Sequence, residues 1–320
     1  MTDIPEQLPH DLTPPTETEL RPETPTDLND PFPVSSQQDV SPLFTQYLKP
    51  PQERIPHLGH LGLLFVLGLI GLGISVFLAN LALNHHLFGV TTLQQAAGEI
   101  HYTLGTEALL YLLTFAGCLI VYPFLWHKGF FAGLQWRGDR AAERAGYLIG
   151  AAVVCFILAM FDGALLPGPP DAPIDRIFRM PGAAWALFAF GVTLAPFFEE
   201  LGFRGFLLPA LATAYDWIME KSGRQLQPDL DANGHPQWSL PAMIVASVLT
   251  SILFAFLHAD QTGYSIGPFL LLVVVSLVLC AARLRLRSLA ASVLIHSTYN
   301  FLLFSFMLIG TGGFKHLDKM

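Results

Sequence analysis

Charged side chains are scarce in this sequence, since Asp, Glu, Lys and Arg together make up only 13% of its 320 residues. Soluble domains carry about 25% charged residues. Hydrophobic residues reach 52%, and the mean hydropathy is +0.48. This composition excludes an ordinary soluble domain and predicts an all-α, polytopic transmembrane helical bundle embedded in the lipid bilayer. We expect no nucleic-acid partner.

Cysteine is also rare, and Cys118, Cys155 and Cys280 all fall inside apolar runs. A lone cysteine in such a run behaves as a small hydrophobic residue. The sequence therefore predicts neither a disulfide framework nor a cysteine-based zinc site. The first residues, Met1 to Pro9, lack the basic start and apolar core of a signal peptide. We expect membrane insertion to begin with the first internal span.

Residues 1–56 differ in composition from the rest of the chain. They hold twelve of the 24 prolines, and ten acidic residues against three basic ones, Arg21, Lys49 and Arg54. Such a segment cannot bury enough apolar surface to fold. We predict a disordered, proline-rich acidic tail over residues 1–56 and a membrane-embedded helical domain over residues 57–320. A partner-docking role for the tail is the alternative.

Seven apolar runs are long enough to cross the roughly 30 Å hydrocarbon core of a bilayer. They are Leu61–Leu83, Leu104–Trp126, Ala145–Leu166, Gly182 to about Leu211, Leu240–His258, Ile266–Ala282 and Ser288–Gly310. The fourth run is too long for a simple crossing. We expect it to be strongly tilted, or broken near Pro196 or Pro209.

The distribution of basic residues predicts the orientation of these spans. With the amino terminus inside, the inner segments contain twelve Lys and Arg and the outer segments contain four. Cytoplasmic connections carry such an excess. We therefore predict an integral multi-pass protein of the cell (inner) membrane with a cytoplasmic amino terminus.

Three ionisable residues lie in the fourth run, which is costly in a bilayer and indicates function. Glu200 and Arg204 are four residues apart on one helical face, so they can form a structural ion pair. Glu199 lies about 100° around the helix from Glu200 and has no such partner. It is a candidate general base. The alternative is a purely structural Glu–Arg lock with a tolerated second glutamate.

Two later spans carry buried polar residues of their own. His258 ends the fifth run, and His296 and Asn300 lie one turn apart in the last. A single histidine inside a membrane usually forms a hydrogen bond between helices. Together with Glu199, however, these residues provide the groups needed for hydrolysis. Glu199 would deprotonate a water held with His258, while His296 and Asn300 would donate hydrogen bonds to the developing oxyanion.

A zinc mechanism uses the same residues differently. His258, His296 and Glu199 would form a His₂Glu ligand set with an open position. Glu199 would then be lost as a base, and the sequence lacks the HExxH motif of compact zinc proteases. The cofactor expectation is therefore either none or one divalent metal, zinc, and the residues alone leave both open.

These residues resemble the three ordered motifs of the CPBP family of intramembrane proteases, which includes the type II CAAX prenyl endopeptidases. The motifs are Glu199-Glu200-xxx-Arg204, Phe254-xxx-His258 and His296-xxx-Asn300. The resemblance covers a catalytic core of about residues 182–305. It implies an intramembrane endopeptidase with Glu199 as base, His258 holding the water, and His296 and Asn300 as the oxyanion hole.

The resemblance does not decide whether a metal is bound. It implies Glu199 as the base, and yet the family is commonly labelled as metalloproteases. Family members often have eight spans, whereas seven are found here. The predicted topology also places His258 near the outer end of its span and His296 nearer the inner end of its own. A tilted helix or a displaced helix boundary would be needed to bring the two together.

Other functions fit some of the same residues. An ion-coupled transporter would also bury carboxylates and histidines, but no second copy of the Glu-Glu-xxx-Arg stretch indicates the paired repeats of many transporters. A non-catalytic binding or immunity member of the family is a further alternative. The expected substrate is a membrane-associated peptide or protein, prenylated or not, and the sequence does not identify it.

Overall fold

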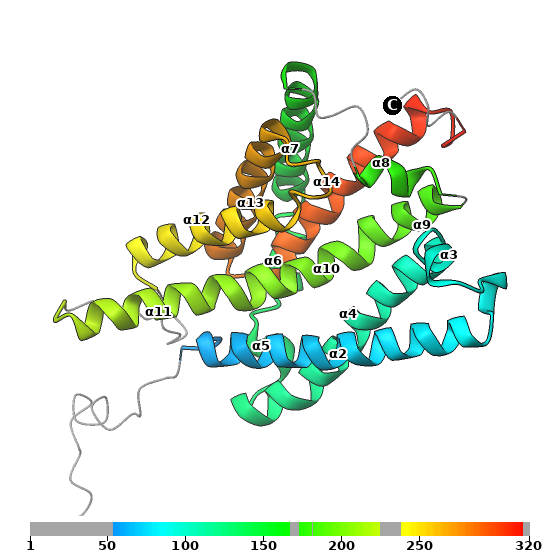
Figure 1. The fold of residues 1–320 in the computed structure, drawn as a ribbon. Helices are drawn as coiled ribbons and strands as arrows, with labels where there is room; N and C mark the ends of the chain where they lie inside the picture. Colours follow the sequence, from blue (N-terminus) through cyan, green and yellow to red (C-terminus); the bar gives the residue numbers. More distant parts are fainter. Residues whose placement is uncertain (1–53, 167–172, 181, 225–237, 316–320) are drawn as a thin grey trace, which may run out of the picture. The chain divides into compact units, whose positions relative to one another are not determined.

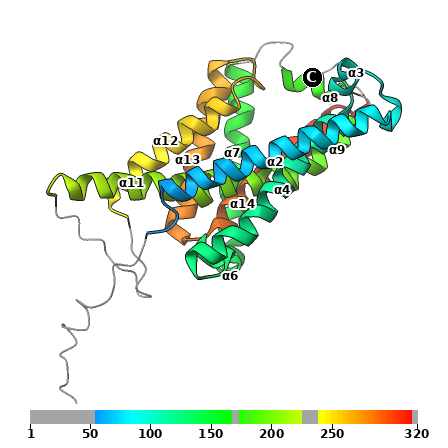
Figure 2. The same ribbon diagram turned by 60° about the horizontal axis from the view of Figure 1, so that its bottom comes forward.

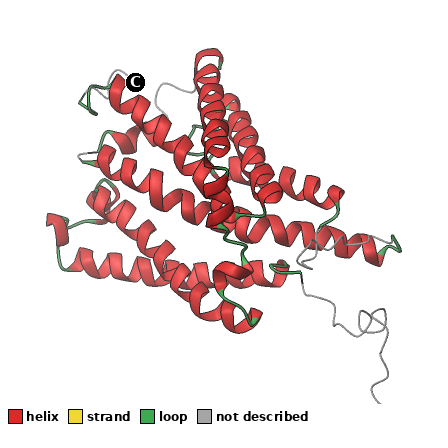
Figure 3. Ribbon diagram, turned by 180° about the vertical axis from the view of Figure 1, so that it is seen from behind, coloured by secondary structure: helices red, strands yellow, loops and turns green. Residues whose placement is uncertain are grey.

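The computed structural model describes residues 54–166, 173–180, 182–224 and 238–315. The chain divides into two units, Met1–Pro51 and Gln52–Met320. Only the second unit contains described residues. These residues form helices and connecting turns, and no strand occurs among them. The helices, coloured red in Figure 3, confirm the predicted all-α class.

Seven helical segments of the described chain are long and apolar enough to span a membrane, which confirms the predicted spans. They are α2 (Leu58–Asn84), α4 (Ile100–Trp126), α7 (Ala145–Leu165), the continuous segment Ala183–Lys221, α12 (Leu240–Leu257), α13 (Ile266–Leu286) and α14 (Leu289–Gly310). Short helices lie in the connections: η1 (Leu87–Gly89), α3 (Leu93–Ala97), α5 (Phe130–Gly133), α6 (Gly138–Glu143) and α8 (Pro173–Phe178).

The long fourth segment runs through the middle of the helical unit (Figure 1). On one side, α2 and α4 pack against each other along much of their length (Figure 2). On the other side, α7, α13 and α14 contact one another, and α12 packs between α11 (Leu208–Lys221) and α13. Many outward-facing side chains are large and apolar, for example Phe124 and Ile309 at 82% and 79% exposed. Such surfaces suit contact with lipid.

The predicted break in the fourth run is wrong. This segment is one unbroken helix, formed by α9 (Ala183–Ala189), η2 (Phe190–Leu194), α10 (Ala195–Glu200), η3 (Leu201–Leu207) and α11 (Leu208–Lys221). Its 39 residues correspond to about 58 Å at 1.5 Å per residue, well beyond the bilayer core. The expected strong tilt therefore stays a prediction. Both η2 and η3 are π-helical.

The first π-helix explains why Pro196 does not end the helix. The N–H of Ala195 donates to Phe190 O, five residues back. The next donor in this pattern would be Pro196, which has no N–H. Gly191 O thus lacks a helical donor, and the Asn300 side chain of α14 supplies one, with Nδ2 2.8 Å away.

The second π-helix repeats this arrangement at Pro209. Leu208 N–H donates to Phe203 O, and Pro209 cannot donate to Arg204 O. The Arg283 side chain of α13 donates to that carbonyl instead, at 3.2 Å from Nε. Proline is tolerated inside a membrane helix where neighbouring helices satisfy the carbonyl that it frees, and side chains do so in both places.

The predicted tail, residues 1–56, lies outside the described residues except for its last three. Arg54 forms ion pairs with Asp216 and Glu220 of α11, at 3.4 Å and 2.9 Å. Ile55 packs against a hydrophobic cluster that includes buried residues of α4, α5 and η3, and Pro56 is buried. Arg54, Ile55 and Pro56 therefore contact the helical domain.

Candidate active site

A buried ion pair links Glu200 to Arg204 within the central helix. Arg204 Nη1 lies 2.8 Å from Glu200 Oε1, and both side chains are fully buried. Arg204 Nη2 also donates to Ser276 of α13, at 2.6 Å to Oγ and 3.2 Å to the carbonyl oxygen. The guanidinium lies 4.7 Å from the centroid of the Phe254 ring. Arg204 thus joins the central helix to α13 and α12.

The Phe254 ring lies against three charged or polar side chains of the site, those of Arg204, His258 and His296. Its ring is 2% exposed, and its centroid lies 4.4 Å from the ring of His258 and 5.9 Å from that of His296. The spacing Phe254-xxx-His258 places both residues on one face of α12. Phe254 therefore lies close to the Arg204 guanidinium and to both histidine rings.

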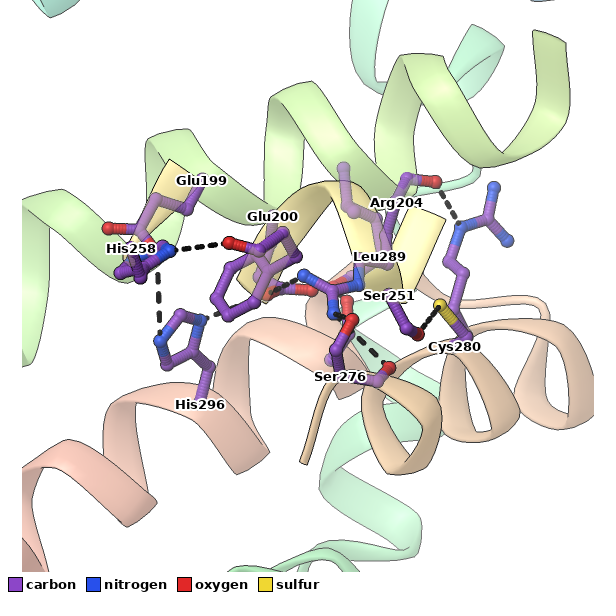
Figure 4. Close-up of polar contacts among 12 residues, drawn as sticks. Glu199, Glu200, Arg204, Ser251, His258, Ser276, Cys280, Leu289 and His296 are labelled. Carbon is purple, nitrogen blue, oxygen red and sulfur yellow. Dashed lines mark hydrogen bonds and ion pairs between the residues drawn. The ribbon is translucent and has the colours of Figure 1, made fainter. Parts of the chain in front are cut away.

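Glu199 faces both histidines, as Figure 4 shows. Its Oε2 lies 3.6 Å from His258 Nε2 and 3.8 Å from His296 Nε2. The three side chains come from α10, from the end of α12 and from α14. The structure therefore brings together His258 and His296, which the simple topology had placed at different depths. In Figure 1, α12 runs alongside α11 rather than along α7, which allows this meeting.

The other ring nitrogen of each histidine has a partner that fixes the tautomer. His258 Nδ1 lies 2.8 Å from Phe254 O, which can only accept a hydrogen bond. His296 Nδ1 lies 2.9 Å from Glu200 Oε1, which also accepts from Arg204. We assign the proton to Nδ1 in both rings on this basis. Both Nε2 atoms are then turned toward Glu199.

Glu199 Oε2 is buried and has no hydrogen-bond partner in the described part of the chain. The distances to the two Nε2 atoms are too long for direct hydrogen bonds. They are short enough for one water to contact Glu199 and a histidine at once. A buried carboxylate oxygen without a partner is unusual, and a water molecule or an ion bound to it is one explanation.

The same three atoms are of the type that a metal would use. Histidines that bind metal also donate their second ring N–H to a carboxylate or carbonyl. A tetrahedral zinc ion, however, holds neighbouring donors roughly 3.3 Å apart, given bonds of about 2.0–2.1 Å. Within the described residues, no group of three His, Cys, Asp or Glu residues meets the spacing for a metal ion. The donor types fit zinc, and the separations of 3.6 Å and 3.8 Å between Glu199 Oε2 and the two Nε2 atoms are somewhat longer than this spacing.

Asn300 lies one turn beyond His296, as the sequence predicted, but it does not contact Glu199 directly in any hydrogen bond of the described chain. One of its amide hydrogens donates to Gly191 O at 2.8 Å. The amide nitrogen has a second hydrogen that can serve another acceptor. Asn300 therefore combines a structural contact with a donor that stays available.

Sequence reasoning missed several residues around this site. Ser276 lies within the apolar run Ile266–Ala282, and Arg283 follows this run directly. Glu107 is a further residue near the site, since its carboxylate accepts from Tyr111 at 2.9 Å and interacts electrostatically with Glu199. A lone Ser or Glu in a span gives no signal without its partners. Arg283 could have been found only if the need for a cap beside Pro209 had been foreseen.

Seven apolar helices around a buried carboxylate and two histidines define an integral multi-pass membrane protein with a polar intramembrane site. Residues 181–302 match the family model for Rce1-like type II CAAX prenyl endopeptidases. This match confirms the resemblance seen in the sequence and, at family level, supports an intramembrane protease. No curated protein and no solved structure gives a significant match to the chain.

Proposed function

We propose that this chain is an intramembrane endopeptidase in which Glu199 activates a water molecule. The observation that carries the proposal is the unpartnered Oε2 of Glu199, which lies within 3.8 Å of two imidazole nitrogens. The neighbouring Glu200 is engaged by Arg204 and His296. Of the two adjacent glutamates, Glu199 is therefore the one left to accept a proton in this pocket.

The proposed reaction begins with a water held between Glu199 Oε2 and His258 Nε2. Glu199 takes one proton as the water oxygen attacks the carbonyl carbon of a peptide bond. The C–N bond then breaks, and the proton moves from Glu199 to the leaving amine. Nδ1–H of His258 stays bonded to Phe254 O throughout and keeps the ring in place.

The negative oxygen formed in this step would be stabilised by His296 and Asn300. Asn300 can donate its second amide hydrogen while the first stays on Gly191 O. His296 would have to donate from Nε2, because Nδ1 is bonded to Glu200. The proposal therefore requires His296 to be an imidazolium when the oxyanion forms, with a second proton on Nε2 in addition to the one assigned to Nδ1. In this scheme, Glu200 and Arg204 position His296 and do not touch the substrate.

The substrate and the orientation belong to the same proposal. The family resemblance supports a membrane-associated peptide or protein as substrate, and prenylation is one of the forms it could take. The excess of basic residues in alternate connections supports a cytoplasmic amino terminus in the cell (inner) membrane. On this orientation, the end of α13 and the start of α12 face the cytoplasm.

The experiment that tests the proposal is a proteomic comparison of membranes containing either the wild-type chain or the Glu199→Ala variant. We expect cleavage products of at least one membrane protein with the wild-type chain and their loss with the variant. Purified wild-type protein should then cleave that substrate. Identical peptide profiles at equal protein levels would contradict the proposal.

The metal question has its own measurement. In the metal-free reaction, chelators leave cleavage essentially unchanged, and active protein contains far less than one equivalent of zinc. In the zinc alternative, His258, His296 and Glu199 would hold an ion that polarises the carbonyl, and His296→Ala would lose metal and activity together. One equivalent of zinc that is lost and restored together with activity would replace the metal-free mechanism.

A further inference from the structure

Three side chains of α14 face the central segment at successive helical turns. His296, Asn300 and Phe304 are four residues apart, which places them on one face of the helix. His296 contacts Glu200, and Asn300 donates to Gly191 O. The residue numbers rise along α14 and fall along the central segment, so the two helices run antiparallel here. Along this face, α14 packs against η2 and α10 (Figure 1).

The contact between the two helices at Gly191 leaves no room for a side chain. A Cβ atom added to this glycine would lie 2.8 Å from Cε2 and 2.9 Å from Cζ of the Phe304 ring. Carbon atoms in favourable contact lie about 3.5–4.0 Å apart. Any other residue at position 191 would therefore have to displace the Phe304 ring by roughly 0.7 Å.

Other aromatic rings hold the Phe304 ring in place. Its centroid lies 5.6 Å from that of Phe178 in α8 and 5.8 Å from that of Phe188 in α9. The ring also packs against the hydrophobic cluster that contains Phe178 and Leu187. Close-packed interiors transmit a local displacement instead of absorbing it. A side chain at position 191 would therefore shift α14 itself and not only the end of one ring.

Such a shift would act on the hydrogen bond one turn earlier in α14. Asn300 Nδ2 lies 2.8 Å from Gly191 O. A displacement of roughly 0.7 Å would lengthen this distance to about 3.5 Å, outside the usual range for a hydrogen bond. The second amide hydrogen of Asn300 would move with the first. That hydrogen is the one that the proposed reaction uses to stabilise the oxyanion.

We propose that Gly191 is a positioning residue for the reaction, because its missing side chain lets α14 approach closely enough to place the Asn300 donor. Gly191 acts through Asn300 and does not contact the reacting atoms. This inference rests on the proposed peptidase function. A misplacement of about 1 Å can lower an enzymatic rate by about 10²-fold. We therefore expect a loss of roughly 10-fold to 100-fold when position 191 carries a methyl group.

The test is steady-state cleavage by purified full-length variants, with the substrate found by the proteomic comparison. Gly191→Ala should lower kcat and leave KM nearly unchanged, because the oxyanion donor acts in the transition state and not in ground-state binding. Phe304→Leu removes the two ring atoms that an added Cβ would meet. In the Gly191→Ala background it should restore kcat to nearly the value of the Phe304→Leu variant alone.

Gly202→Ala is the matched control, because it is the same substitution in η3 of the same segment. A Cβ atom at Gly202 would enter open space, and alanine favours a helix more than glycine does. Its kcat should equal that of the wild-type chain, and its melting temperature should be unchanged or higher. Gly191→Ala should instead lower the melting temperature. Adding Asn300→Ala to Gly191→Ala should lower it little further, because the hydrogen bond is already lost.

Three results would overturn the inference. The first is a Gly191→Ala variant with the kcat of the wild-type chain, or one whose activity falls only in proportion to its folded fraction. The second is a folded double variant with Phe304→Leu in which kcat stays low. The third is fully additive losses of melting temperature for Gly191→Ala and Asn300→Ala. A wild-type chain that cleaves nothing would remove the proposed function as well, whereas an active wild-type chain with an unaffected Gly191→Ala variant removes this inference alone.

Discussion

The two π-helices of the central segment solve the same backbone problem with different side chains. At η2, Pro196 leaves Gly191 O without a donor, and the Asn300 amide caps it. At η3, Pro209 leaves Arg204 O in the same position, and the Arg283 guanidinium caps it. Both caps come from another helix, so each proline also ties the central helix to a neighbour.

The two capping side chains differ in whether they keep a hydrogen-bond donor for other partners. Arg283 also donates to Leu134 O and Gln135, and the nearby Arg204 binds Glu200 and Ser276. Asn300 keeps a second amide hydrogen, and the carboxylate of Glu199 keeps an unpartnered oxygen. We infer that the residues around η3, which are Arg204, Arg283 and their partners, stabilise the fold (the η3 side). The residues around η2, Asn300 and Glu199, keep polar groups available for the reaction (the η2 side).

The largest effect, on the cleavage rate, is expected when the two adjacent glutamates are each replaced by glutamine in separate variants. Glu199→Gln should lower the rate of substrate cleavage by about 10²–10⁴-fold, because a glutamine cannot act as general base. Its melting temperature should stay near that of the wild-type protein, since Oε2 makes no hydrogen bond. The rate is measured with purified enzyme and the substrate found by proteomics.

Glu200→Gln is the matched control, because it is the same substitution one residue away. It should lower the thermal stability, since Glu200 accepts from both Arg204 and His296. Near-normal cleavage by the Glu199→Gln protein, or equal losses of stability in the two variants, would show that the two glutamates do not differ as inferred.

The next effect concerns the packed η3 side. Arg204→Ala should reduce the free energy of unfolding by about 3–5 kcal/mol, because it leaves the Glu200 carboxylate buried without its cationic partner. Thermal unfolding in detergent, together with the yield of folded protein, measures this loss. Ser276→Ala is the milder control and should cost about 1.5–3 kcal/mol through the lost hydrogen bond to a charged group.

An unchanged melting temperature in both variants would mean that the Arg204 network contributes nothing to the fold. A loss for Ser276→Ala as large as that for Arg204→Ala would also contradict the inference. In that case the bond between the helices, rather than the ion pair within one helix, would carry the stability.

The third prediction separates the two roles of Asn300. Asn300→Ala should lower the cleavage rate by about 10²–10³-fold through the lost oxyanion donor. It should also cost about 1–3 kcal/mol of stability, because Gly191 O is left without a donor. These two losses can be separated by restoring a backbone donor in the central helix.

Pro196→Ala supplies that donor, since alanine has the N–H that proline lacks. In the double variant with Asn300→Ala, we expect the melting temperature to recover and the cleavage rate to stay low. Recovery of both would assign Asn300 a purely structural role. Pro196→Ala alone is the reference for any effect of the new residue itself.

The sequence predicted the spans well because each is a continuous apolar run that a bilayer requires. It could also suggest the Glu200–Arg204 contact, because a spacing of four residues depends only on helix geometry. The meeting of Glu199 with His258 and His296 needed more than this. It depends on the direction of α12, which is set by packing and not by local sequence.

The continuity of the central helix could not be predicted from its prolines. Pro196 and Pro209 suggest breaks, and only the caps from Asn300 and Arg283, more than 70 residues away, make an unbroken helix acceptable. Such long-range contacts have no local signature. The same is true of Ser276, whose value as a partner of Arg204 appears only when α13 is placed beside η3.

The smallest effect is expected at the start of the packed region. A chain beginning at Gln52 should keep its stability and cleavage rate, because the removed residues belong to the separate first unit.

A chain beginning at Leu58 also lacks Arg54, whose side chain is 15% exposed and pairs with Asp216 and Glu220. The pair with Glu220, which is 41% exposed, contributes up to about 1 kcal/mol. The shorter chain also removes a partner of the buried Asp216 and the hydrophobic contacts of Ile55. We expect a lower melting temperature for the shorter chain with little change in cleavage by the folded fraction. A loss of activity in the properly inserted chain that begins at Gln52 would instead show that the first unit binds substrate or partner.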